Sequence, residues 1–287
     1  MSGKIWFITG ASRGLGRAWT QAALARGDKV VAAVRSVESM AALVDEFRES
    51  ILPVVVDVGD RAAVFAAVDT AVARFGRIDV VVSNAGFGLF GAIEETEEAQ
   101  ARQQFDVNLF GTLWAIQAVL PHLRRQGAGR ILVTSSIAGI ITFPTAGIYN
   151  ATKWAVEGLT ETLASEVAGF GIKVTLIEPG GYDTDWRGSS AAHTRPDPAY
   201  EPLRRKMKEA GVGRKLGDPA ATAPAILAVV DAEEPPLRLI LGSAGLPSAR
   251  NVYAQRLRTW EAWASTSEAA QGHRPEPVEA SPSAARR

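Results

Sequence analysis

Residues 5–16 of this 287-residue chain have the sequence IWFITGASRGLG, in which a run of β-branched and aromatic residues ends in three glycines. A helical pattern follows over Gly14–Arg26. Glycines allow a tight turn, and the first turn of a helix offers unpaired N–H groups to an anion. The stretch therefore predicts a strand–turn–helix unit that holds the pyrophosphate of a dinucleotide. Its spacing, Gly-x3-Gly-x-Gly, differs from the Gly-x-Gly-x-x-Gly fingerprint, and a plain tight turn is the alternative.

Short apolar runs alternate with longer amphipathic stretches as far as residue 241. Most runs lack polar–apolar alternation, which is typical of parallel strands covered on both faces. We expect strands at Ile5–Thr9, Lys29–Val34, Leu52–Asp57, Ile78–Ser83, Arg130–Ser135, Lys173–Glu178 and Leu237–Leu241. We expect helices at Gly14–Arg26, Glu38–Glu49, Arg61–Phe75, Phe105–Gln126, Tyr149–Ala168 and Pro219–Asp231. The pattern predicts an α/β fold, a single doubly wound Rossmann-type domain with a mainly parallel seven-stranded sheet.

Two segments depart from this alternation. The connection 181–217 is rich in Gly, Ser, Ala and Pro and has no clear strand, so we expect a lid, with a static surface loop as the alternative. The basic cluster within it, from Arg204 to Lys208, is interpreted as a solvated helix face. Residues 1–264 are expected to form one domain that includes this lid. The Pro-, Ala-, Glu- and Ser-rich segment 265–287 is expected to be a disordered tail.

Composition excludes several classes of function. Lys plus Arg and Asp plus Glu both total 31, so the net charge of zero gives no attraction to nucleic acid or anionic lipid. The absence of cysteine excludes disulfides, thiolate catalysis and Cys-based zinc sites. The histidines, at 122, 193 and 273, have no metal-ligand spacing, and no metal site is predicted. A strand pattern begins almost at once and no apolar run reaches roughly 18 residues, so a cytoplasmic protein without a signal peptide is expected.

Candidate cofactor residues follow the strands, because ligands of such sheets bind beyond the carboxyl ends of the strands. Arg35 follows the second strand, where an acid favours NAD and an arginine accommodates the 2′-phosphate of NADP. With Arg13 it predicts NADP(H), two plain surface arginines being the alternative. Asp57 can accept a hydrogen bond from an adenine amino group. The candidates in these turns are Gly10, Ser12, Arg13, Gly14, Leu15, Gly16, Arg35, Asp57, Val58, Asn84, Ala85 and Gly86.

A group of polar residues after the fifth strand carries the candidate chemistry. Ser136 follows that strand, and Tyr149 and Lys153 come four residues apart at the start of a helix, so that they share a face. A free tyrosine has a pKa of about 10, and a nearby ammonium lowers it by favouring the phenolate. A serine hydroxyl can hold a substrate oxygen while the tyrosine gives or takes its proton.

Taken together, these residues resemble the short-chain dehydrogenase/reductase family, in its NADP-preferring branch, over about residues 4–241. The matching positions are Gly10, Gly14, Gly16, Asp57, Asn84-Ala85-Gly86, Asn108, Ser136, Tyr149, Lys153 and Pro179-Gly180 followed by Thr184. Ser83 is a departure, since many members carry a second asparagine there.

The resemblance implies a role for each matching residue. Tyr149 would be the general acid/base, Ser136 the donor to the substrate oxygen, and Lys153 the ligand of the nicotinamide ribose that tunes Tyr149. Asn108 would hold a water that relays protons. Pro179, Gly180 and Thr184 would hold the carboxamide. The implied activity is an NADP-dependent interconversion of a ketone or aldehyde and an alcohol.

Two other classes of function are weighed against this one. An NADP-sensing relative without turnover would lack the tyrosine or the lysine, and a methyltransferase on a similar sheet would not need them. For the substrate, aromatic residues in the expected pocket indicate an apolar or ring-containing carbonyl compound. These residues are Phe87, Phe90, Phe143 with Pro144, Tyr182, Trp186 and Tyr200. The helices Phe105–Gln126 and Tyr149–Ala168 resemble the family's assembly surfaces, which implies a homodimer or homotetramer.

Overall fold

The computed structural model describes residues 3–188, 190–211 and 215–272. They fall into two compact units, residues up to 245 and the segment from 246 on, and each is described by itself. The strands of the first unit are β1 (Ile5–Thr9), β2 (Lys29–Val34), β3 (Ile51–Val55), β4 (Val80–Ser83), β5 (Leu89–Phe90), β6 (Gly129–Thr134), β7 (Ile172–Pro179), β8 (Ala192–His193) and β9 (Arg238–Leu241). Its helices are α1 (Gly14–Ala25), α2 (Ala41–Phe47), α3 (Arg61–Phe75), α4 (Glu98–Phe105), α5 (Gly111–Gln126), α6 (Gly147–Val167), α7 (Glu201–Gly211) and α8 (Ala223–Asp231).

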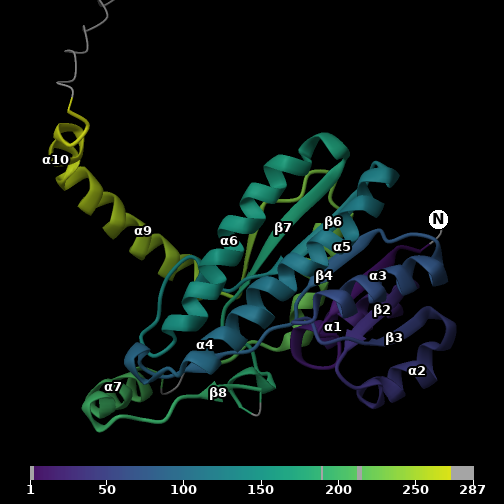
Figure 1. The fold of residues 1–287 in the computed structure, drawn as a ribbon, viewed down its shortest axis with the longest axis horizontal. Coiled ribbons are helices and arrows are strands. Elements are labelled where there is room, and N and C mark those ends of the chain that lie inside the picture. The colour runs from purple at the N-terminus through teal and green to yellow at the C-terminus, as the bar shows by residue number, and fades with distance from the viewer. Residues whose placement is uncertain (1–2, 189, 212–214, 273–287) are drawn as a thin grey trace, which may run out of the picture. The chain divides into compact units, whose positions relative to one another are not determined.

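Seven of the strands form one sheet in the order β3-β2-β1-β4-β6-β7-β9, and every neighbouring pair is parallel. Figure 1 shows these strands lying side by side with helices packed across them. The short strands β5 and β8 pair with each other in a separate two-stranded sheet. The predicted doubly wound Rossmann-type fold is confirmed.

Helices cover both faces of the large sheet and bury two hydrophobic cores. One core packs α3, α5 and α6 against the sheet through residues such as Val68, Val119 and Val156. The other packs α1, α2 and α8 against the opposite face through Trp19, Leu43 and Ile226. Burial on both faces explains why the strand sequences are continuously apolar.

The strand order reverses at β1, which lies between β2 and β4. From β1 the chain adds β2 and β3 on one side, and then β4, β6, β7 and β9 on the other. The turns that leave β1 and β4 therefore diverge at the carboxyl edge of the sheet, where a crevice for a ligand forms in folds of this kind.

The structure differs from the sequence-based prediction in several elements. Strand ends shift by up to two residues, and Asp57 lies beyond β3. The helix expected at Phe105–Gln126 is instead a π-helical turn over Asp106–Phe110 (η4) followed by α5, and α4, which ends at Phe105, was not predicted. Within the expected lid the structure contains β8 and α7.

The second unit contains α10 (Ala264–Ala269) and all but the first residue of α9 (Gly245–Ala262). Residues 265–269, expected in the disordered tail, are therefore helical, while residues 273–287 of that prediction lie outside the described residues. The division at 245 leaves the expected domain end at 264 a prediction. No helix among the described residues is long and apolar enough to cross a bilayer.

Candidate active site

The glycine turn after β1 is tightly packed against the turn after β4. Gly10 and Gly14 have φ values of 66° and 53°, in the left-handed region that favours glycine. A Cβ on Gly10 would lie 2.9 Å from the Ala85 Cα, and a Cβ on Gly16 would lie 2.3 Å from the Gly10 carbonyl oxygen. The turn therefore requires these glycines, and it brings the start of α1 to the crevice, where its free N–H groups can bind phosphate.

Asn84 joins three strand ends at this crevice. Its Nδ2 donates to the carbonyls of Thr9 at 3.2 Å and Gly10 at 3.3 Å, and its Oδ1 accepts from the Thr134 hydroxyl at 3.3 Å. The buried Thr9 hydroxyl accepts from the amides of Asn84 and Ala85. Thr9 is a residue that the sequence analysis missed, although a polar residue at the end of an apolar strand is a recognisable signal. Ser83, the family departure, donates to Thr112 at 3.1 Å.

The candidate residues that follow β2 and β3, with Arg13 from the turn after β1, reach the molecular surface. The side chains of Arg13, Arg35 and Asp57 are exposed, and a carboxylate oxygen of Asp57 accepts from the Gly59 amide at 3.0 Å. Arg17, which the sequence analysis missed, donates to the Ser39 carbonyl at 3.1 Å and so links α1 to the segment after β2. Val58 is buried and packs where a Cβ on Gly111 would lie.

Lys153 lies on α6 with its ammonium fixed at the end of β6. Its Nζ donates to the Thr134 carbonyl at 2.7 Å, and the residue is 5% exposed. Burial lowers the pKa of Lys153 to about 8, while the negative charge of Glu157 opposes that shift.

Tyr149 is buried one turn before Lys153, in a small apolar cluster. The Lys153 Nζ is 5.9 Å from the centre of the Tyr149 ring, and the Trp186 ring centre is 4.9 Å from it. The cluster also contains Ala138, which follows Ser136 by two residues. The Ser136 Oγ accepts from the Ala138 amide at 3.1 Å, which fixes the serine at the start of a short helical turn.

Asn108 occupies the π-helical turn η4, an irregularity that is common at functional sites. Its Oδ1 accepts from the Phe87 amide at 3.1 Å, and its Nδ2 donates to the Phe87 carbonyl at 3.0 Å and to the Thr152 hydroxyl at 3.3 Å. A Cβ on Gly86 would lie 3.1 Å from the Asn108 Oδ1 and 3.9 Å from the Lys153 Nζ. Asn108, Lys153 and the turn after β4 therefore meet at Gly86.

The segment after β7 returns to the glycine turn. Gly180 donates its amide to the Leu241 carbonyl at 2.9 Å, which continues the sheet beyond Pro179. A Cβ on Gly14 would lie 3.3 Å from the Thr184 Cγ2, so Thr184 contacts the first turn of α1. The predicted carboxamide site is thus next to the predicted pyrophosphate site.

Only part of the predicted substrate pocket comes together. Phe90, Phe143 and Trp186 pack against the small cluster of Ala138, Ala146 and Tyr149. Tyr182 instead packs against the core on the other face of the sheet, and the Tyr200 hydroxyl donates to Glu94. The structure thus places Tyr182 away from the cluster that contains Tyr149.

Two buried carboxyl groups near Lys153, and the partly exposed Arg238 that lies beside both, were not predicted from the sequence. Glu157 follows Lys153 by one turn, and Arg238 on β9 pairs with it at 3.0 Å. Glu178, at 1% exposed, lies 3.4 Å from Arg238, and neither of its oxygens accepts a hydrogen bond from any residue that the structure describes. Burial raises the pKa of Glu178 to about 7, with the Glu157 charge adding to the shift.

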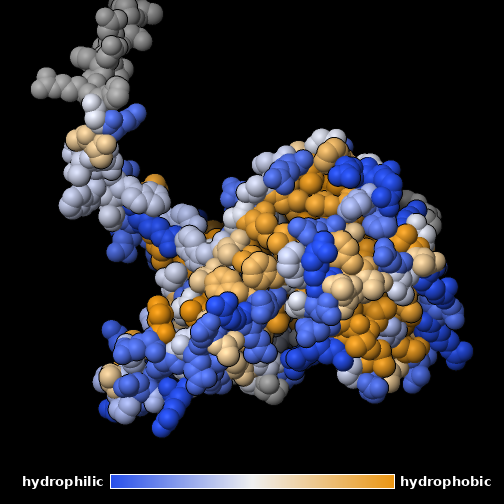
Figure 2. Space-filling model, in the orientation of Figure 1, coloured by the Kyte–Doolittle hydropathy of each residue, from blue (hydrophilic) through white to orange (hydrophobic). Residues whose placement is uncertain are grey.

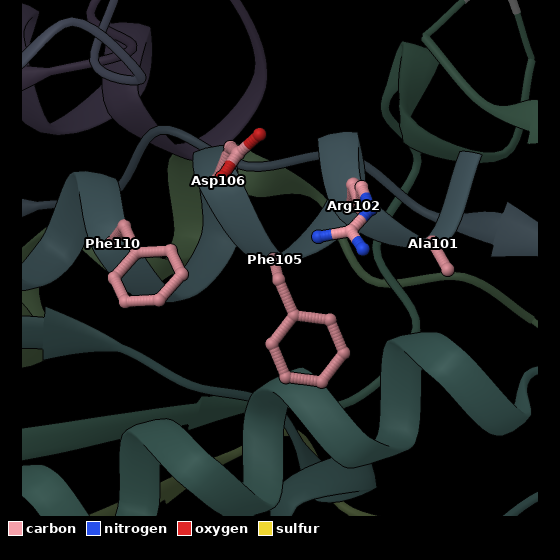
Figure 3. Close-up of a pocket in the computed structure, with 5 residues that line it drawn as sticks. All are labelled: Ala101, Arg102, Phe105, Asp106 and Phe110. Carbon is pink, nitrogen blue, oxygen red and sulfur yellow. The ribbon is translucent and has the colours of Figure 1, made fainter. Parts of the chain in front are cut away.

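A separate surface hollow of about 340 Å³ lies along α4 and η4. Figure 3 shows its lining residues, with the rings of Phe105 and Phe110 on the same side of the helix. None of these lining residues is among the predicted cofactor or catalytic residues.

The chain is similar to a known oxidoreductase and to a solved short-chain dehydrogenase. Oxidoreductase BOA17 of Botryotinia fuckeliana is 43% identical over 243 residues, which cover 83% of this chain and 89% of that protein. A short-chain dehydrogenase from Streptomyces avermitilis has a similar structure, with a TM-score of 0.87 and 36% identity over 94% of this chain and 98% of that one.

Two further solved structures contain nicotinamide nucleotides. A short-chain dehydrogenase/reductase from Burkholderia phymatum, in complex with NAD, has a TM-score of 0.75 at 29% identity and covers 87% of this chain and 92% of that one. An alcohol dehydrogenase from Thermococcus sibiricus, complexed with 5-hydroxy-NADP, has a TM-score of 0.69 at 28% identity and covers 84% of this chain and 97% of that one. The family model described as short chain dehydrogenase matches residues 4–195. The chain is a member of the short-chain dehydrogenase/reductase family of oxidoreductases.

Proposed function

We propose that this chain is an NADP(H)-dependent oxidoreductase that interconverts a ketone or aldehyde and an alcohol, with Tyr149 as its general acid/base. The observation that carries the proposal is the meeting of Lys153 and Asn108 at Gly86, one turn from the buried Tyr149. Lys153 could serve nucleotide binding alone, but that role would leave the buried phenol of Tyr149 beside it without a function.

The residues of the crevice fit a dinucleotide. The glycine turn passes tightly from β1 into α1, because side chains at Gly10 and Gly16 would collide with backbone, and it presents the start of α1 to a pyrophosphate. The exposed arginines Arg13 and Arg35 fit a 2′-phosphate, which supports NADP(H) over NAD(H). When bound, the nicotinamide supplies or accepts the hydride.

The proton chemistry belongs to the chain's own residues. In the direction of reduction, the hydroxyls of Ser136 and Tyr149 hold the carbonyl oxygen, and Tyr149 donates its proton to that oxygen. The Lys153 ammonium stabilises the resulting phenolate, and its bond to the Thr134 carbonyl holds it in place. In the direction of oxidation the phenolate takes the proton from the alcohol.

In this proposal the side chain of Asn108 has a structural role, because it joins the segment after β4 to α6. Both ends of its amide are bonded, to the Phe87 backbone and to Thr152. A relay water would therefore bind the Asn108 backbone carbonyl, which accepts from the Thr112 hydroxyl at 3.0 Å and has a second lone pair.

The substrate is proposed to be a carbonyl compound with an apolar group, because Phe90, Phe143 and Trp186 pack against the cluster that contains Tyr149. Turnover of aliphatic, aromatic and steroid ketones with NADPH tests the proposal. Tight NADPH binding without turnover of any of these would instead support the alternative, a relative that senses NADP and does not catalyse.

A further inference from the structure

The second half of the expected lid is joined to the segment that follows the turn after β4. The Ala192 amide donates to the Gly88 carbonyl at 2.8 Å, and the Thr194 amide donates to the Phe90 carbonyl at 3.0 Å. A Cβ on Gly91 would lie 1.8 Å from the Thr194 Oγ1. Residues 192–204 therefore approach the segment 88–95 so closely that only glycine fits at 91.

The carboxylate of Glu95 lies at the centre of this junction, with 2% of its side chain exposed. One oxygen accepts from the Asp197 amide at 2.7 Å and from the Arg204 guanidinium at 2.6 Å. The other accepts from the Ala92 amide at 2.7 Å and the Thr194 hydroxyl at 3.0 Å. Three of these four donors belong to the lid, so a single carboxylate connects the two segments.

The carboxyl group of Glu95 is expected to be ionised at neutral pH. The hydrogen bonds from the Asp197 amide and the Arg204 guanidinium hold the pKa of Glu95 near 2, far below its ordinary value. Charge-assisted hydrogen bonds of this kind are the strong ones in proteins. The junction is therefore a fixed attachment at neutral pH.

The junction also borders the aromatic cluster around Tyr149. The Phe90 ring, next to Gly91, has its centre 5.4 Å from that of Trp186 and 5.6 Å from that of His193 in the lid. Trp186 in turn contacts Tyr149. The junction therefore holds one side of the aromatic cluster that contains Tyr149.

We propose that Glu95 is a positioning residue that anchors residues 192–204 of the lid to the segment 88–95 and so sets the width of the pocket at Tyr149. The inference rests on the proposed function. It divides the lid: residues 192–204 are docked by the junction, and Trp186, whose ring contacts Tyr149, lies outside it. Substrate size is then limited by the fixed wall at Phe90.

Glu95→Gln tests the anchor with little change in volume. A glutamine has one oxygen in place of two acceptors, and its NH2 group would face donors, so the variant loses the charge and part of the junction. Glu98→Gln is the matched control, because Glu98 is exposed and pairs with Arg102 within α4 at 2.7 Å. Arg204→Gln removes the guanidinium that donates to Glu95 from the lid, and it is the variant to use if Glu95→Gln folds poorly.

Hydrogen exchange of the NADPH-bound protein is the readout that does not depend on turnover. In Glu95→Gln, exchange in 192–204 and 88–95 is expected to rise about tenfold, with Arg204→Gln intermediate and Glu98→Gln like the wild type. Unchanged exchange in both junction variants would overturn the anchor. If the wild type turns over no carbonyl compound, the proposed function fails, but this comparison still decides the role of Glu95.

Kinetics then test the link to pocket width. With a small ketone, Glu95→Gln is expected to raise KM about tenfold while the Kd for NADPH stays within about twofold. The ratio of kcat/KM for a bulky ketone to that for the small one should rise, because the wall at Phe90 is then held less firmly and can move. If kcat/KM falls by the same factor for both ketones, so that their ratio is unchanged, Glu95 does not set the width of the pocket.

Discussion

Lys153 donates from its Nζ to the carbonyl oxygen of Thr134 at 2.7 Å. Thr134 is the last residue of β6 and precedes the turn that carries Ser136. This hydrogen bond therefore joins α6, which carries Tyr149, to the turn after β6, which carries Ser136. It also leaves the ammonium other protons with which to bind a ribose and to face Tyr149.

The charge state of Lys153 is expected to depend on Glu157. The negative carboxylate raises the pKa of Lys153, which burial holds at about 8, so Glu157→Gln should lower that pKa further. The alkaline limb of kcat/KM for ketone reduction should then move to lower pH, by roughly one pH unit or less. Glu161→Gln, an exposed partner of Arg238, is the control. If the alkaline limb of kcat/KM lies at the same pH in Glu157→Gln as in the wild type, the proposed effect of Glu157 on Lys153 is contradicted.

Arg35→Asp is expected to shift the cofactor preference from NADPH toward NADH. A carboxylate at this position repels a 2′-phosphate and can accept from a ribose hydroxyl. Loss of a charge-assisted contact costs about 1.5–3 kcal/mol, which is roughly 10- to 150-fold in the ratio of kcat/KM values for the two cofactors. If the ratio is unchanged, the preference rests on Arg13, and Arg13→Ala should then change it.

The buried carboxyl of Glu178 is expected to destabilise the folded protein at alkaline pH. Its folded pKa of about 7 lies above the ordinary value of 4.5, so the fold favours the protonated form and loses stability as pH rises from 4.5 through 7. Above that range the penalty is about 3 kcal/mol at most. Glu178→Gln should therefore unfold at higher urea concentration than the wild type at about pH 8, with little difference at about pH 5. If Glu178→Gln stabilises the protein equally at both pH values, the raised pKa of Glu178 is contradicted.

The α5 and α6 side of the first unit is proposed to form the interface of a homodimer or homotetramer. Figure 2 shows apolar surface on the face that carries these helices, and Phe110 and Trp154 are 39% and 38% exposed. An aspartate at Phe110 should break such an interface, so Phe110→Asp should lower the mass measured by light scattering to that of a monomer. A wild type that is monomeric at micromolar concentration would contradict the proposed assembly.

Much of the fold follows from local sequence alone. The bounds of β1, β2 and α3 match the prediction, because strands buried on both faces are continuously apolar and α3 begins after Asp60, whose side chain caps it. The π-helical turn at Asn108 was not predicted, because its sequence continues the helical pattern of α5 without a break.

The contacts of the lid could not be predicted from local patterns. Arg204 lies in a basic cluster that was interpreted as a solvated helix face, yet its guanidinium binds the buried Glu95 more than a hundred residues away. Tyr182 illustrates the same limit, because an aromatic residue near the site can pack into either core. The strand β8 was missed because two residues show no periodicity.

The assignment of Tyr149 as general acid/base is tested most directly by NADPH oxidation in the wild type and in Tyr149→Phe, with a ketone that the wild type reduces. The variant keeps the ring that contacts Trp186 and loses only the proton donor. Its kcat should fall by about 10²–10⁴ while the Kd for NADPH stays within a few-fold. A variant that reduces the ketone at a near-normal rate would contradict the account.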